Sequence, residues 1–455
     1  MTLLERLGGR ETVTRGIVDT FRAISRPPHP SGQEGAAADA VAALLSGLGL
    51  GTERDGAGNL LCRVPAAPGR EGAPELVLQG HLDMVCAAAP GSGWNPQTDP
   101  VTVVEADGFL RSDGRSSLGA DNNLGNAAVL WLLASGKLRH GPLRLLFTTA
   151  EEVGLEGAKQ VSPAWLAGAG YLLNTDGFHL GRAIVGSAGG RRERWRAPLD
   201  TVPAPDAPAW RITLSGGLGG HSGDDINRGR ANPIKLLAAL LAGLPGGRTA
   251  SLEGGAAFNA IPAWAQAVVL CRNAPDLAPL EGALADYRAA DPNLRLACAP
   301  AERPETVWSP AFPGVVGASA NLGRAGAEGD GYEICTFLRA GRGELEEELA
   351  ARHAALGAEH GFAAQISGYP GWPADRDNPL ASLLERVWRE QTGRTLELTA
   401  VHVGLEPSVL RAKAPGLVMA STGPDILDAH SVDERAPLAG LADYALLLAG
   451  AMEAL

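Results

Sequence analysis

A group of histidine, aspartate and glutamate residues follows the apolar runs of this chain or opens its predicted helices. The group comprises His81, Asp83, Asp121, Glu151, Glu152, Asp176 and His430. Ligands of open α/β sheets bind outside the carboxyl ends of the strands, so these side chains are expected to meet at one edge of a sheet. Imidazoles and carboxylates crowded together there need a cation to offset their charge. The sequence therefore predicts a metal site.

The types and number of these ligands indicate which metals bind. Histidine with carboxylate suits zinc, with cobalt and manganese as substitutes. One tetrahedral ion that keeps a position open cannot use so many ligands, whereas two ions about 3.5–4 Å apart can share a carboxylate. We therefore expect two divalent ions per chain, Zn2+ first and Co2+ or Mn2+ as alternatives.

The spacing of the residues adds two expectations for this site. In an extended segment, Asp83 lies on the same side of the chain as His81, and its carboxylate can accept the second imidazole N–H. Glu151 and Glu152 are adjacent and cannot both point the same way. One of them is expected to bind metal, and the other to take a proton from the metal-bound water.

Each piece taken alone has an ordinary structural explanation. A lone His-x-Asp is more often incidental, adjacent glutamates are more often solvated, and an aspartate that opens a helix, such as Asp121, is more often a cap. Only their joint occurrence at strand ends favours chemistry. Two other motifs fail: the glycines at 217, 219 and 220 do not form a dinucleotide loop, and Gly-His-Ser-Gly-Asp at 220–224 is not the Gly-x-Ser-x-Gly of serine hydrolases.

Composition excludes several classes of protein. The chain has 39 Lys+Arg and 51 Asp+Glu, a formal charge of −12, which argues against nucleic acid or an anionic membrane as the main partner. Its five cysteines are far apart and form no Cys-x-x-Cys pair, which excludes a disulfide scaffold and fits a reducing compartment. No signal peptide and no apolar run of about 18 residues is found. We expect a cytoplasmic protein.

The elements that must position these residues alternate between strand and helix. Apolar runs at 75–80, 143–149, 171–174 and 416–420 predict strands, and residues 123–135 and 380–391 predict helices. This alternation indicates an α/β domain with a mostly parallel sheet flanked by helices. The Arg-rich segment 191–196 and the Pro/Ala run after it indicate a boundary. We predict a first part of the catalytic domain at 1–186, an inserted α+β lid domain at 187–372, and a second part at 373–455.

Seven strings of this chain are distinctive. They are Leu-Gln-Gly-His-Leu-Asp-Met-Val at 78–85, Leu-Gly-Ala-Asp-Asn at 118–122, Thr-Ala-Glu-Glu-Val-Gly-Leu-Glu-Gly-Ala at 149–158, Gly-Gly-His-Ser-Gly-Asp-Asp-Ile at 219–226, Asn-Ala-Ile-Pro at 259–262, Gly-Tyr-Pro-Gly-Trp at 368–372 and Ala-His-Ser-Val-Asp-Glu-Arg at 429–435. They resemble the aminoacyl-histidine dipeptidases, cytosolic di-zinc enzymes also called β-alanyl-histidine or Xaa-His dipeptidases, of the aminoacylase/carboxypeptidase clan. The resemblance covers nearly the whole chain and implies metal-dependent hydrolysis of dipeptides.

The resemblance also implies a role for each residue of the group. His81 and Asp176 would bind one metal, Glu152 and His430 the other, and Asp121 would bridge the two. Glu151 would be the general base that moves a proton from the attacking water to the leaving amine. Asp83 would orient His81.

Further roles in substrate binding follow from the same resemblance. His221 would stabilise the tetrahedral oxyanion, and Asn259 and Arg339 would hold the terminal carboxylate of the substrate. Glu406 would line the pocket for the substrate's amino group, with a structural role as the alternative. The chain departs from the family at Asn-Thr-Asp (174–176) and at His-Val-Gly-Leu-Glu-Pro-Ser (402–408), which leaves the substrate preference open.

Two competing functions remain at this stage, an N-acyl amino acid deacylase of the same clan and a non-catalytic peptide-binding protein that retains the metal. A free Glu151 disfavours the second, because a glutamate that binds no metal has little use in a binder. The expected partner is a small peptide substrate. A homodimer is left open, as is the question of whether His221 acts in its own chain or across a dimer.

Overall fold

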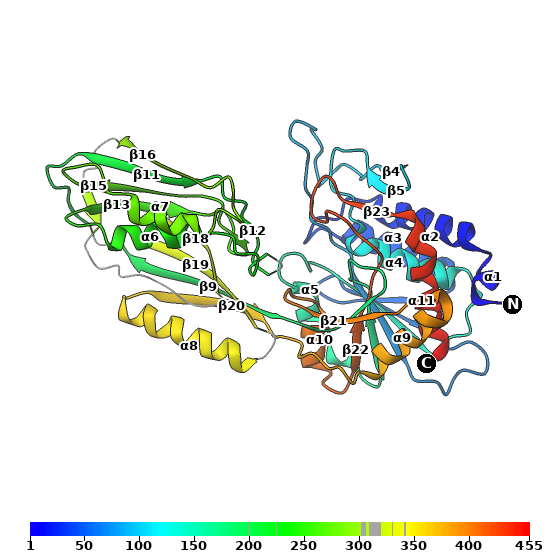
Figure 1. The fold of residues 1–455 in the computed structure, drawn as a ribbon. Coiled ribbons are helices and arrows are strands. Elements are labelled where there is room, and N and C mark those ends of the chain that lie inside the picture. Colours follow the sequence, from blue (N-terminus) through cyan, green and yellow to red (C-terminus); the bar gives the residue numbers. More distant parts are fainter. Residues whose placement is uncertain (200, 224, 302–305, 309–319, 330, 341–342) are drawn as a thin grey trace. The chain divides into compact units, whose positions relative to one another are not determined.

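The computed structural model describes the chain apart from residues 200, 224, 302–305, 309–319, 330 and 341–342. It divides into two compact units (Figure 1). Unit 1 contains Met1–Ser187 and Pro370–Leu455, and unit 2 contains Ala188–Tyr369. The sequence-based boundaries lie after residues 186 and 372. The predicted fold class, an α/β domain carrying an inserted α+β domain, is confirmed.

Unit 1 is built on an eight-stranded sheet. Its strands, in spatial order, are β1 (Thr52–Arg54), β2 (Leu60–Val64), β6 (Leu143–Thr148), β3 (Leu76–His81), β7 (Tyr171–Asn174), β22 (Val418–Ser421), β8 (Arg182–Ser187) and β21 (Glu397–Val401). The central strands β6, β3, β7 and β22 run parallel. Every residue of β3 and of β6 is buried, which explains why both strands read as nearly continuous apolar runs.

Helices complete unit 1 around this sheet. They are α1 (Leu3–Leu7), α2 (Arg10–Ser25), α3 (Gly35–Gly47), α4 (Ala120–Ala134), α5 (Glu156–Gln160), α9 (Pro379–Thr392), α10 (Pro407–Lys413) and α11 (Leu441–Ala454). Helix α11 contacts α2, α4 and α9, α2 contacts α4, and α4 also packs on β3. Their apolar faces form one core with the sheet, including the fully buried Phe21, Phe147 and Tyr444.

A small three-stranded sheet also belongs to unit 1. It contains β4 (Val103–Ala106), β5 (Phe109–Ser112) and β23 (Arg435–Pro437). Strand β23 follows closely on His430, so this sheet ties the C-terminal loop to the segment that precedes α4.

Unit 2 is an eight-stranded antiparallel sheet covered by helices. Its strands, in spatial order, are β16 (Arg295–Ala301), β11 (Ala209–Ser215), β15 (Ala265–Leu270), β13 (Arg248–Gly254), β18 (Ala320–Glu328), β19 (Gly331–Ala340), β9 (Gly189–Pro198) and β20 (Ala363–Tyr369). The helices are α6 (Pro233–Ala242), α7 (Ala278–Ala285) and α8 (Gly343–Glu359), and two short sheets pair β12 (Gly220–His221) with β14 (Ala260–Ile261) and β10 (Thr201–Pro203) with β17 (Thr306–Trp308).

The Arg-rich segment 191–196, which was interpreted as the sign of a domain boundary, belongs to unit 2 and begins a few residues after that unit starts. It lies inside strand β9, which pairs with β19 on one side and β20 on the other. Glu193 and Trp195 are buried, while Arg194 is only partly buried and Arg196 is exposed. This alternation is typical of a strand with one buried face, and the charge density of the segment obscured it.

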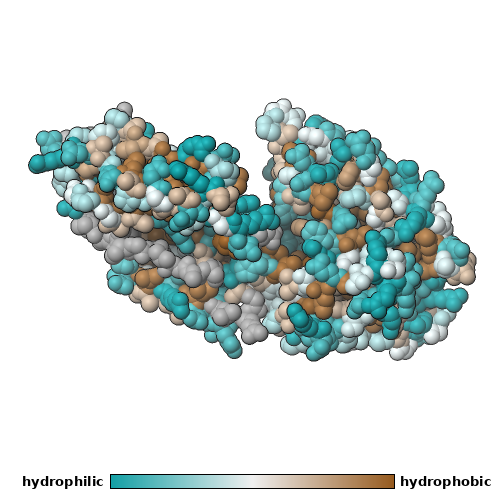
Figure 2. All heavy atoms as spheres, viewed as in Figure 1, coloured by the Kyte–Doolittle hydropathy of each residue, from teal (hydrophilic) through white to brown (hydrophobic). Residues whose placement is uncertain are grey.

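The surface is mixed in character. Hydrophilic and hydrophobic residues are interspersed on the face of each unit that Figure 2 shows. Within the part of the chain that the structure describes, no helix is long and apolar enough to cross a membrane.

Candidate metal centre and active site

His81 ends strand β3 and lies at the centre of the site. Its side chain is 1% exposed, with Nδ1 3.0 Å from the backbone oxygen of Asp83 and Nε2 3.1 Å from Asp121 Oδ1. A proton on Nδ1 donated to the Asp83 carbonyl leaves the Nε2 lone pair free for a metal. Gly80 lets helix α4 come this close, because a Cβ there would lie 2.0 Å from Asn122 Oδ1.

Asp83 holds the glutamate pair as well as the imidazole. Its Oδ1 lies 3.4 Å from His81 Nδ1 and accepts a hydrogen bond from the Glu151 backbone N–H at 3.0 Å. Its Oδ2 accepts from the Glu152 backbone N–H at 3.1 Å and from the Ser31 hydroxyl at 2.7 Å. The carboxylate predicted to orient His81 therefore also fixes the turn after β6. Ser31 was not anticipated from the sequence.

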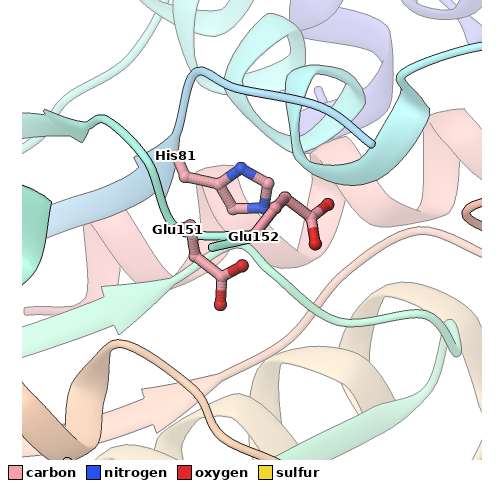
Figure 3. Close-up of side chains that lie close together, drawn as sticks. All are labelled: His81, Glu151 and Glu152. Carbon is pink, nitrogen blue, oxygen red and sulfur yellow. The ribbon is translucent and has the colours of Figure 1, made fainter. Parts of the chain in front are cut away.

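Adjacent glutamates follow β6 at the same sheet edge. Figure 3 shows the carboxylates of Glu151 and Glu152 at separate positions beside the His81 ring. The preceding residue, Ala150, has a φ of 49°, in the left-handed region that side chains other than glycine rarely adopt. Strained backbone of this kind concentrates at functional sites.

Asp121 lies between the two histidines. Its Oδ1 is 3.1 Å from His81 Nε2, and its Oδ2 is 2.9 Å from His430 Nε2. It belongs to two clusters of potential ligands whose atoms lie within 4.8 Å of one another, one with His81 and Asp176 and the other with Glu152 and His430. One carboxylate thus faces two neighbouring ligand sets.

His430 approaches Asp121 from the C-terminal loop. Its side chain is 45% exposed, and its φ is 64°. Its ring meets Phe178 edge-on, with centroids 6.4 Å apart. The sequence analysis did not single out Phe178. The only sign in the sequence that this ring lies near the site is its place two residues after Asp176.

The charges of the site shift the pKa values of both histidines. Burial alone would lower the pKa of His81, but the hydrogen bonds to Asp121 and Asp83 raise it well above its usual value. Burial also opposes the shift at His430, where the hydrogen bond to Asp121 and the nearby carboxylate of Glu152 raise the pKa to about 11. When no metal cation is bound, protons on the two imidazoles offset the negative charge of the carboxylates.

The pKa values of two carboxyl groups of the site, Asp176 and Glu151, are also raised. Burial, reinforced by the charge of Asp121, raises the pKa of Asp176 well above its usual value. Burial does the same at Glu151, where the charges of Glu152 and Asp176 add to it. The site thus takes up protons that a divalent cation would displace.

The donor set fits a divalent metal. Glu152 Oε1 is buried and makes no hydrogen bond of adequate geometry, although His430 Nε2 lies 3.1 Å away. Imidazole nitrogens and carboxylate oxygens converging on such an atom are ligands that zinc and related ions accept.

We expect metal affinity to rise with pH. The histidine pKa values are raised in the metal-free site and the imidazoles must lose their protons to bind, so binding releases protons and tightens as pH increases. Each released proton corresponds to about a tenfold change in affinity per pH unit. Calorimetric titration with Zn2+ in buffers of different ionisation enthalpy measures this release. Affinity independent of pH between 6 and 8 would contradict it.

Glu406 lies in a buried polar layer under the sheet edge. Its side chain is fully buried, and its Oε2 accepts hydrogen bonds from Gln79 Nε2 at 2.5 Å and Thr148 Oγ1 at 2.7 Å. Burial raises its pKa to about 7. The contacts of Oε2 agree with a structural role, whereas Oε1 is buried without a hydrogen-bond partner. Contact with the substrate's amino group therefore stays a prediction.

The residues predicted in the inserted domain gather within unit 2. Strand β12, which ends at His221, pairs with β14, so that His221 lies opposite Ala260. The backbone oxygen of Asn259 accepts from the Ser222 N–H at 2.9 Å. Arg339 Nη2 is 3.2 Å from His221 Nε2. Asp224, part of the same motif, lies outside the described residues.

Arg339 is held on several sides. Its Nε donates to Ser222 Oγ at 3.3 Å and its Nη1 to the Tyr369 hydroxyl at 3.5 Å. Its guanidinium lies over the Phe337 ring, 4.5 Å from the centroid. No distinctive motif surrounds Arg339 in the sequence, and its neighbours come from three separate segments of unit 2.

Comparison with known proteins identifies the family. The model of peptidase family M20/M25/M40 matches residues 77–454. The chain belongs to this family. It is therefore a hydrolase that acts on peptide bonds, as predicted.

Two relatives of this M20 peptidase are similar over almost their whole length. The cytosol non-specific dipeptidase of Escherichia coli is 31% identical over 467 aligned positions, which cover 94% of this chain and 95% of that protein. The crystal structure of aminoacylhistidine dipeptidase from Vibrio alginolyticus matches with a TM-score of 0.80 at 27% identity, covering 97% of this chain and 96% of that one. Aminopeptidase PepT from Bacillus cereus shares the fold, with a TM-score of 0.60 at 18% identity and coverage of 97% and 98%.

Proposed function

We propose that this M20 peptidase is a metal-dependent dipeptidase that hydrolyses Xaa-His dipeptides such as β-Ala-His and accepts other dipeptides. The observation that carries the proposal is the pair of ligand clusters sharing Asp121, with Glu151 at the same sheet edge. The names of the E. coli and Vibrio relatives, both dipeptidases, support the substrate class.

The proposed ligands divide between two ions. His81 and Asp176 would hold one, Glu152 and His430 would hold the other, and Asp121 would be shared by the two. The position of Asp121, with one carboxylate oxygen toward each histidine, supports this division. The bound ions, Zn2+ or in its place Co2+ or Mn2+, supply Lewis-acid activation of a water molecule and of the peptide carbonyl.

Glu151 is the proposed general base. It takes a proton from the attacking water and returns it to the amine as the C–N bond breaks, so that two amino acids leave. Asp83 fixes the backbone of Glu151 through its N–H and orients the His81 ring from the other side. Asp83 thus supports both the proposed base, Glu151, and a proposed metal ligand, His81.

Unit 2 supplies the proposed substrate contacts. His221 stabilises the oxyanion of the tetrahedral intermediate, and Arg339 and Asn259 bind the terminal carboxylate of the dipeptide. A planar guanidinium that donates two parallel hydrogen bonds suits a carboxylate, and the contacts with Ser222 and Phe337 restrict its orientation.

We also propose a cytoplasmic location. The E. coli relative is named as a cytosol enzyme. All five cysteines are free in the structure, as expected in a reducing compartment.

An activity panel tests the proposed function. Zinc-loaded protein is incubated with β-Ala-His, Leu-Gly and N-acetyl amino acids, and released amino acids are measured. We expect cleavage of the two dipeptides and none of the acetylated compounds. Cleavage of the acetylated set alone would establish the competing deacylase activity, and binding of β-Ala-His without turnover would favour a peptide-binding protein.

A further inference from the structure

Glu434 places a buried carboxylate against the start of helix α4. Its side chain is 2% exposed. Oε2 accepts hydrogen bonds from the backbone N–H groups of Leu118 at 2.9 Å and Gly119 at 3.0 Å. Oε1 accepts from those of Ala120 at 2.8 Å and Asp121 at 3.3 Å. One carboxylate therefore occupies four successive backbone donors.

These donors have no other source of capping in the helix itself. The first N–H groups of a helix lack intrahelical acceptors, and the N-cap of α4 is Gly119, which has no side chain to accept them. The charge of a carboxylate is also favourable at the positive end of the helix dipole. Glu434 thus caps α4 from a distant point of the sequence and fixes the backbone that carries Asp121.

The same glutamate anchors the loop that carries His430. Backbone hydrogen bonds join Leu427 and Arg435 in both directions, at 2.9 and 3.0 Å, and close the loop between them. Asp428 and His430 both have positive φ values, 52° and 64°. A closed loop with two such residues keeps its shape only if its surroundings hold it.

Glu434 therefore connects two segments that meet at the site. Its carboxylate binds the backbone of Asp121, it lies four positions after His430 in the chain, and His430 Nε2 lies 2.9 Å from Asp121 Oδ2. We propose that Glu434 is a positioning residue that sets the distance between Asp121 and His430 and thereby the affinity of the ion they share. This inference rests on the ligand assignment of the proposed function.

Glu434→Gln is the sharpest test because it keeps the length of the side chain. The amide replaces one acceptor oxygen with an NH2 donor, which then faces two backbone N–H donors. Asp433→Asn is the matched control, since Asp433 is exposed in the same loop and loses the same charge. Co2+ binding is measured by equilibrium dialysis with elemental analysis and by the visible absorption of the bound ions.

We expect Glu434→Gln to weaken the binding of one of the two Co2+ ions, the one at Asp121 and His430, by about 10–100-fold. Loss of a group that supports a metal ligand usually lowers metal affinity by this factor. The absorption of that ion should change more than that of the ion at His81, because both use Asp121 but only the first also depends on the loop of His430, while Asp433→Asn should match the wild type. Saturating Co2+ should restore turnover to Glu434→Gln, which a loss of folding would not allow.

Other outcomes separate the inference from the proposed function. Two ions bound by Glu434→Gln with wild-type affinity and spectrum would overturn the inference. If Glu434→Gln does not fold, Glu434→Asp, which keeps the charge but is one methylene shorter, takes its place with the same expected loss. A wild type that binds two ions but cleaves no dipeptide would overturn the proposed function alone, and one that binds no ion would overturn both.

Discussion

Replacing Glu151 with glutamine is expected to lower kcat by about 10²–10⁴-fold while the protein retains both metal ions. The amide keeps the size of the side chain but cannot take up a proton. Burial and the neighbouring carboxylates raise the pKa of Glu151 well above its usual value in the metal-free site, so this group is disposed to hold a proton that it can later return. Turnover of β-Ala-His and elemental analysis of the same sample measure the two effects.

The neighbouring residue provides the matched comparison. Glu152→Gln changes the same chemistry one position along the chain, at the glutamate whose Oε1 lies 3.1 Å from His430 Nε2. We expect it to lose metal as well as activity, whereas Glu156→Gln, on the exposed start of α5, should change neither. A variant Glu151→Gln that turns over like the wild type, or one that loses an ion, would refute its assignment as the base.

The sheet and the group of residues at its edge could be predicted because their signals are local. Strands β3 and β6 are buried on both faces, so their sequences are apolar throughout and their ends stand out. His81 ends β3 and Glu151 follows β6 closely, so the parallel pairing of the two strands brings them together. The expectation of a mostly parallel sheet and the principle that ligands bind at strand ends were sufficient for this step.

Two supports of these residues could not be predicted, because each comes from a distant segment: Ser31 lies in no motif, and Glu434, although it belongs to the string at 429–435, gives no sign in the sequence of which backbone it contacts. Ser31 reaches Asp83 from a turn near the N-terminus, and Glu434 reaches the α4 backbone from the C-terminal loop. A serine or glutamate in a loop has the same appearance whether it is solvated or buried. Glu406 is a further example, since the sequence left a substrate contact and a structural role open for it, and only the structure shows its hydrogen bonds to Gln79 and Thr148.

Replacing His221 with alanine is expected to lower kcat by about 10²–10³-fold with metal content unchanged, the cost of removing one donor to an oxyanion. The contact with Arg339 determines which ring nitrogen of His221 can donate a hydrogen bond to the substrate. A guanidinium has no acceptor, so His221 Nε2 must accept from Arg339 Nη2 and the ring proton resides on Nδ1. The ring can therefore present Nδ1–H as the donor that an oxyanion requires.

The backbone around His221 keeps the ring in place for this role. The His221 N–H donates to Asp225 Oδ2 at 2.8 Å, and Asp225 also pairs with Arg230 at 3.1 Å. Gly220, at φ 123°, has no room for a side chain, since a Cβ would lie 1.9 Å from Arg230 Nη1. Loss of the imidazole should therefore leave the loop folded, and kcat should fall without loss of binding.

Two comparisons decide whether this account of His221 holds. Arg339→Lys keeps a charge but loses the planar fork, so it should raise KM for dipeptides more than it lowers kcat. His360→Ala, just after α8 in the same unit, should leave both unchanged, and a wild-type rate for His221→Ala would remove His221 from the reaction.

Mixing inactive His221→Ala with inactive Glu151→Gln then tests where His221 acts. Activity recovered in the mixture requires a site assembled from two chains, because each variant supplies the group that the other lacks, whereas a mixture that stays inactive after subunit exchange places His221 and Glu151 in the same chain.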